Sequence, residues 1–172
     1  MAYIEWIELE TFFSGYLLIY AVIYLVASYL PVTNFVKTRA LPQLPLAYAL
    51  IGTVYLGLQL KNGYPGYHIN QLVADIQFPY LKIWGLLSVF FWIPILHKKG
   101  VFSMLHSLVF FIILLASFFS QLFSPSTGND MEGNNMKIYS VSILLNIAAL
   151  ILVIFISCLM VRFKKQNRIT HI

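Results

Sequence analysis

Charged residues are scarce in this sequence. Only 10% of its 172 residues are Asp, Glu, Lys or Arg, whereas about 25% is usual in a soluble domain. Hydrophobic residues make up 60% of the chain, and the mean hydropathy is +0.81. This composition excludes an ordinary soluble domain and indicates an integral membrane protein. The net charge of +5 lies in short segments beside apolar runs, so we expect it to set membrane topology and not to bind nucleic acid.

Cysteine and catalytic motifs are also nearly absent. The single cysteine, Cys158, lies inside an apolar run and has no partner for an internal disulfide. The chain contains no nucleophile–base pair, no Gly-rich phosphate loop and no zinc-ligand spacing. We therefore predict neither catalytic residues nor a metal site.

Acidic residues are few, and all of them lie outside the long apolar runs. The six acids are Glu5, Glu8, Glu10, Asp75, Asp130 and Glu132. A proton- or cation-coupled pump needs carboxylates inside the membrane. We therefore expect no acid buried in a spanning helix, and a minor transporter is only a second alternative.

Five apolar runs dominate what is present. They cover Phe12–Leu30, Leu44–Leu60, Phe78–Leu96, Val101–Phe123 and Ile138–Val161. Roughly 20 apolar residues cross a bilayer as a helix. The sequence thus predicts an all-α membrane protein with five transmembrane helices, forming a single bundle over residues 1–172. Pro94 lies inside the third run and should kink that helix.

A short basic turn fixes the expected orientation. The third and fourth runs are joined only by His97, Lys98, Lys99 and Gly100, and lysine marks cytoplasmic loops. With this turn inside, eight basic residues fall inside: Lys37, Arg39, Lys98, Lys99, Arg162, Lys164, Lys165 and Arg168. The other three fall outside, where Lys82 would reach the surface along its flexible stem: Lys61, Lys82 and Lys137. We predict an outside N-terminus and an inside C-terminus, in a bacterial inner membrane.

The outer loop between the second and third runs contains a short amphipathic pattern. Apolar residues recur at helical spacing within residues 67–78, at Ile69, Leu72, Val73 and Ile76. Such a helix either lies in the membrane interface and docks a partner, with Leu72 and Asp75 as candidate contacts, or simply packs the loop against the bundle.

Polar and small residues form seams along the spans. Tyr20 and Tyr24 lie in one seam and Asn146 in another. Their polar groups need partners inside the membrane. These three residues are candidate partner contacts, while packing within the bundle and a quinone or lipid pocket are the alternatives.

His97 and His106 are the candidate cofactor ligands, because haem iron takes axial histidines. They differ in depth and no acid supports them as an outer shell. We therefore predict no cofactor, with haem or quinone left open. Lys98 and Lys99 are candidate contacts for anionic lipid headgroups.

Taken with the missing catalytic motifs, the seams favour a function as an accessory or structural subunit of a larger membrane complex. The lipid bilayer and other membrane subunits are the expected partners. The first alternative is a small membrane enzyme or redox subunit with a lipid or quinone pocket.

Overall fold

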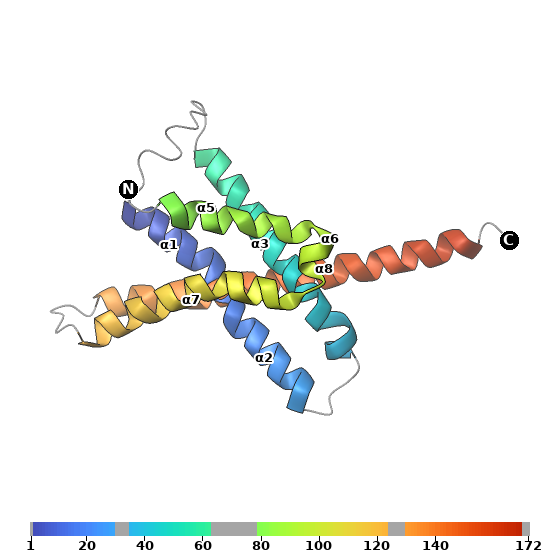
Figure 1. Ribbon diagram of the computed structural model, residues 1–172, viewed down its shortest axis with the longest axis horizontal. Helices are drawn as coiled ribbons and strands as arrows, with labels where there is room; N and C mark the ends of the chain where they lie inside the picture. Colours follow the sequence, from blue (N-terminus) through green and yellow to red (C-terminus); the bar gives the residue numbers. More distant parts are fainter. Residues whose placement is uncertain (1, 30–34, 63–78, 124–129, 170–172) are drawn as a thin grey trace.

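The structure is a computed structural model that describes residues 2–29, 35–62, 79–123 and 130–169. Every element in these ranges is helical. In chain order they are α1 (Ala2–Phe13), α2 (Tyr16–Tyr29), the π-helical turn η1 (Val36–Ala40), α3 (Leu41–Asn62), α5 (Pro79–Leu87), the 3-10 helix η2 (Ser88–Trp92), α6 (Pro94–His97), α7 (Gly100–Phe123) and α8 (Asp130–Ile169). Figure 1 shows these helices and the two chain ends.

Three helical stretches are long and apolar enough to cross a membrane. They are Ile7–Tyr29, Val36–Asn62 and Lys137–Phe163, and two shorter apolar stretches cover Tyr80–Trp92 and Gly100–Ala116. The expected all-helical fold is confirmed for the described residues, and the long apolar helices fit a membrane protein. Five crossings and their orientation stay predictions. The amphipathic segment 67–78 lies outside the described residues.

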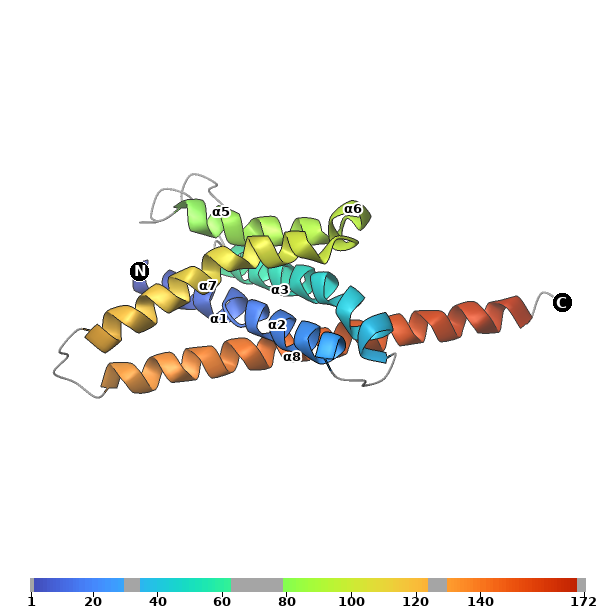
Figure 2. The same ribbon diagram turned by 60° about the horizontal axis from the view of Figure 1, so that its bottom comes forward.

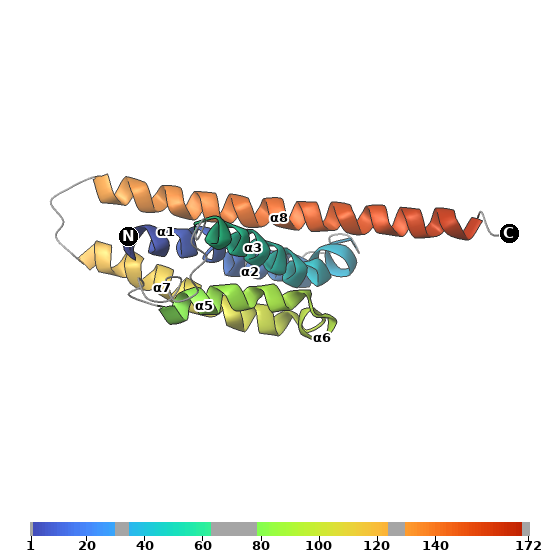
Figure 3. The ribbon, with the colours of Figure 1, turned by 90° about the horizontal axis from the view of Figure 1, so that it is seen from above.

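The helices form three layers. α8 runs along one side, α1, α2 and α3 form the middle, and α5 to α7 cover the opposite side (Figure 3). Figure 2 shows the same order from another direction, with α7 and α8 on opposite sides of α1 and α2. The middle layer therefore carries the core, which is rich in aromatic side chains: the rings of Phe13 and Phe110 stack at 4.8 Å, and those of Tyr16 and Tyr48 lie 4.3 Å apart.

The first apolar run begins earlier than predicted and is bent. Residues 2–13 are already helical, and the chain turns at Ser14 and Gly15 before α2. The bend lies directly against α8, because the Gly15 N–H donates to Oγ of Ser142 over 2.9 Å. A Cβ on Gly15 would lie 2.8 Å from the backbone nitrogen of Ile143. Only glycine permits this approach of two backbones.

The third apolar run is broken, not merely kinked. After η2, Ile93 is extended, with φ −70° and ψ 127°, and α6 starts at Pro94. The residue before a proline avoids helical angles, which explains why the break falls one residue earlier than the proline itself. The two runs joined by the basic turn still form a hairpin, α5 to α7, since Trp84 of α5 contacts His106 of α7.

α8 is longer than the last apolar run at both ends. It begins at Asp130, before the apolar run that starts at Ile138, and it continues to Ile169 beyond the predicted end at Val161. Hydropathy marks the part of a helix that suits a membrane, but Lys, Gln, Glu and Met extend helices equally well in water. The polar flanks therefore shift the helix ends outward.

Candidate functional site

The first candidate site is the surroundings of His106, in the middle of the bundle. Its imidazole stacks on the indole of Trp84, with ring centres 4.7 Å apart and planes at 6°. The ring of Phe91 stands edge-on to it at 5.6 Å. On the α3 side, the hydroxyl of Tyr48 is hydrogen-bonded to Nδ1 of His106 over 2.8 Å. Three neighbouring elements thus fix the orientation of this imidazole.

A second hydrogen-bonded pair, Tyr16 and Ser103, lies in the interior of the bundle. Ser103 donates to the carbonyl of Gly100 over 2.8 Å, so Tyr16 is the donor in its own 2.8 Å bond to the Ser103 hydroxyl. The pair lies beside the first one, since the Tyr16 ring contacts that of Tyr48. These hydroxyls are satisfied within the chain, as interhelical bonds in membrane bundles commonly are.

His106 keeps one nitrogen, Nε2, buried and without a hydrogen-bond partner in the described part of the chain. When Tyr48 donates to Nδ1, the ring proton resides on Nε2. That nitrogen could ligate a metal only in the other tautomer. Among the described residues, no group of three or more His, Cys, Asp or Glu could hold a metal ion. In this geometry His106 packs in the core and shares a hydrogen bond with Tyr48.

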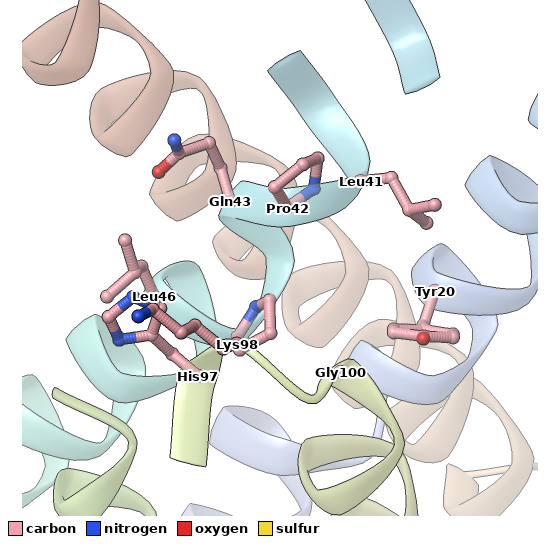
Figure 4. A pocket seen from close by; sticks show the side chains of 9 residues that line it. Tyr20, Leu41, Pro42, Gln43, Leu46, His97, Lys98 and Gly100 are labelled. Carbon is pink, nitrogen blue, oxygen red and sulfur yellow. The ribbon is translucent and has the colours of Figure 1, made fainter. Parts of the chain in front are cut away.

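The second candidate site is a cavity of about 420 Å³ at the end of the bundle that carries the basic turn. Nine residues from α2, α3, α6, the turn after α6 and the start of α7 line it: Tyr20, Leu41, Pro42, Gln43, Pro45, Leu46, His97, Lys98 and Gly100. Figure 4 shows His97 and Lys98 on one side of this cavity and Tyr20 on the other. The cavity thus joins an apolar wall to a cation and a phenol.

The two candidate cofactor ligands have different surroundings. His97 lines the cavity, whereas His106 is enclosed by the rings of Trp84, Phe91 and Tyr48. His97 also has a buried nitrogen, Nδ1, without a hydrogen-bond partner among the described residues. The hairpin does not bring both imidazoles to this one cavity.

The candidate partner contacts fall in three different places. Tyr20 is partly buried at the cavity, and Tyr24 is 53% exposed on the outer face of α2. Asn146 is buried in α8, where its amide donates to the carbonyls of Phe12 and Ser142 over 3.0 and 2.8 Å. Its polar group is therefore used inside the chain. Leu72 and Asp75 lie outside the described residues.

The two candidate headgroup contacts, Lys98 and Lys99, differ in whether they line the cavity. Lys98 lines the cavity. Both lysines are exposed. Lys99 is absent from the lining, and its Nζ lies 5.8 Å from the centre of the Phe102 ring. Two adjacent residues of equal charge thus have different surroundings.

Two buried charged residues were not expected. Glu10 is buried in α1, inside the apolar stretch Ile7–Tyr29. We expected no acid to be buried in a spanning helix, and for this stretch that expectation is wrong. Lys82 is buried in α5 instead of reaching the surface. Nearby in sequence, Glu8 accepts a hydrogen bond from Gln59 over 3.0 Å. The early start of the first helix is the reason that hydropathy alone missed these acids.

Comparison of the chain with family models, with curated proteins and with solved structures finds no match.

Proposed function

We propose that this chain is a five-span membrane protein of a bacterial inner membrane, with its N-terminus outside and its C-terminus inside. The distribution of charge supports this orientation. The basic turn at Lys98, the start of α3 and the C-terminal end of α8 lie toward one end of the molecule, whereas the N-terminus lies toward the other (Figure 3). Basic residues mark the cytoplasmic side of membrane proteins.

We further propose that it acts as an accessory or structural subunit of a larger membrane complex. The observation that carries this proposal is the end of α8, which projects beyond the other helices (Figure 1). The last α8 side chains that bond to the rest of the described chain are Ser157, to Gln43, and Cys158, to Arg39. Beyond them, Met160 is 68% exposed and Phe163 is 63% exposed.

These side chains lie in the apolar stretch Lys137–Phe163, where lipid or a second subunit would cover them. They extend past the level of Gln43 and Arg39, toward the basic side of the proposed membrane. Successive helical residues point about 100° apart, so Leu159, Met160 and Val161 face different directions and are all exposed. A helix that is apolar all round needs cover on all sides, from lipid or from protein. A second membrane subunit would supply it, and the exposed phenol of Tyr24 offers that subunit a hydrogen bond.

The test is the size of the particle that contains this chain. After gentle extraction of the natural membrane, size-exclusion chromatography should show a particle larger than one 19.7 kDa chain in detergent. Met160→Gln should shift the chain toward the smaller size. Ile95→Gln is the matched control, because Ile95 is 75% exposed at the same end of the bundle but belongs to α6. A single-chain particle from the natural membrane would contradict the subunit function.

The cavity favours one second candidate, a small membrane enzyme or redox subunit with a lipid or quinone pocket. Its volume is within the range of small-molecule sites, about 300–1,000 Å³. Turnover of a defined lipid or quinone by the isolated chain would support this candidate over the subunit.

A further inference from the structure

The cavity at the basic end combines features that suit an anionic amphiphile. Four of its lining residues, Leu41, Pro42, Pro45 and Leu46, form an apolar wall at the start of α3. His97 and Lys98, at the turn, line the same cavity. One ligand in this cavity would contact both apolar surface and positive charge, which is what a lipid with an anionic headgroup requires.

The polar side of the cavity offers donors for an anion. Lys98 is a cation with three donors, and none of the nine lining residues is acidic. Nδ1 of His97 is buried without a hydrogen-bond partner among the described residues. A buried polar atom that lacks a partner is costly, so a ligand oxygen at this atom would relieve that cost.

The first residue of α7 closes the cavity between these groups. Gly100 lines it, and a Cβ at this position would lie 2.9 Å from the hydroxyl oxygen of Tyr20. Glycine therefore lets the phenol of α2 approach the start of α7. The start of a long helix carries partial positive charge, which adds to the potential of Lys98.

We propose that this cavity binds the phosphate group of an anionic phospholipid, with Lys98 as its cation, His97 and Tyr20 as hydrogen-bonding groups, and the α3 wall against the glycerol and first methylenes. The proposal rests on the proposed membrane location of the chain, but not on its having a protein partner. A neutral quinone would make no use of the charge of Lys98, whereas a phosphate would, and we therefore favour the phospholipid.

The experiment uses the full chain, purified in a neutral detergent, and measures lipid retention by native mass spectrometry together with the thermal unfolding midpoint. Phosphatidylglycerol should be retained and should raise the midpoint, whereas phosphatidylcholine should do so much less. Lys98→Gln should weaken phosphatidylglycerol binding by about tenfold, a loss of about 1.4 kcal/mol, because the variant removes the cation. Lys99→Gln should keep the binding of the natural chain.

Further variants and competing ligands distinguish a bound phospholipid from other causes of lipid retention. Tyr20→Phe keeps the ring and removes only the hydroxyl, so it should weaken binding by a smaller factor than Lys98→Gln. Equal losses in the two lysine variants would overturn the proposal, because they would indicate attraction to the basic surface as a whole. Inorganic phosphate that saturates the site and displaces the lipid would assign it to a soluble anion and overturn the lipid. Displacement by a ubiquinone analogue, with no dependence on Lys98, would do the same in favour of a quinone.

These outcomes do not depend on the subunit function. Lipid retention is measured on the isolated chain, whereas the subunit function is tested by particle size in the natural membrane. A large particle without lipid selectivity would overturn only the cavity proposal, and a single-chain particle with lipid selectivity would overturn only the subunit.

Discussion

Tyr48 and His106 join α3 to α7 through one 2.8 Å hydrogen bond in the middle of the bundle. Both residues are buried. The bond satisfies the phenol and one imidazole nitrogen at a depth where lipid has no group to offer. The pair therefore links the middle layer to the outer hairpin by polar contact as well as by ring packing.

Removing one partner of this pair should destabilise the protein. Tyr48→Phe leaves Nδ1 of His106 without its bond, and we expect a loss of about 0.6–1.7 kcal/mol in the free energy of unfolding. The double variant Tyr48→Phe with His106→Phe should lose less than the sum of the singles, because both polar groups are then gone. Chemical unfolding in detergent measures both. Tyr24→Phe, on an exposed phenol, is the control, and additive losses would contradict the coupling.

The close approach of Gly15 to α8 should make this position intolerant of any side chain. Gly15→Ala puts a methyl group against the Ile143 backbone, which cannot swing away, and we expect a cost of about 1–3 kcal/mol. Gly57→Ala is the matched control, because no heavy atom lies within 4 Å of its added Cβ. It should be neutral or stabilising by up to about 1 kcal/mol. The measurement is the thermal unfolding midpoint of both variants. Equal midpoints for Gly15→Ala and Gly57→Ala would disprove the close packing of Gly15 against α8.

The proposed orientation predicts opposite labelling of two engineered cysteines. In a Cys158→Ser background, Gly128→Cys should react with an impermeant thiol reagent on intact spheroplasts, and Gln166→Cys should react only after permeabilisation. The basic segments hold the second site on the cytoplasmic side. The reverse pattern would invert the orientation.

The amphipathic pattern over residues 67–78 gives a prediction from sequence alone. Leu72→Glu puts a charge on its apolar face, so it should weaken attachment of this loop to the membrane or to a partner. Asp75→Asn, off that face, should be mild if the segment only packs. The readout is co-purification of the complex together with the unfolding midpoint. If Leu72→Glu changed neither co-purification nor the unfolding midpoint, residues 67–78 would not form an amphipathic docking helix.

Hydropathy was sufficient to predict the helical class and the turn at Lys98, because long apolar runs and a lysine pair are local signals. It placed helix ends poorly, as at Asp130 and Ile169, since helices continue into polar residues. The candidate sites needed tertiary information. The pairing of Tyr48 with His106, 58 residues apart, and the different surroundings of Lys98 and Lys99 depend on how α3 meets the hairpin. No local spacing records that contact.

The break at Ile93 has a mechanical consequence for the cavity. From Ile93 to Phe102 the backbone closes a series of its own hydrogen bonds, including His97 N–H to the Ile93 carbonyl and Phe102 N–H to the Lys99 carbonyl. The turn is thus a stiff unit that meets η2 through one extended residue. Because Phe102 belongs to α7, this unit is continuous with the helix that carries His106. The positions of His97 and Lys98 against the α3 wall are therefore coupled, through α7, to the packing around His106.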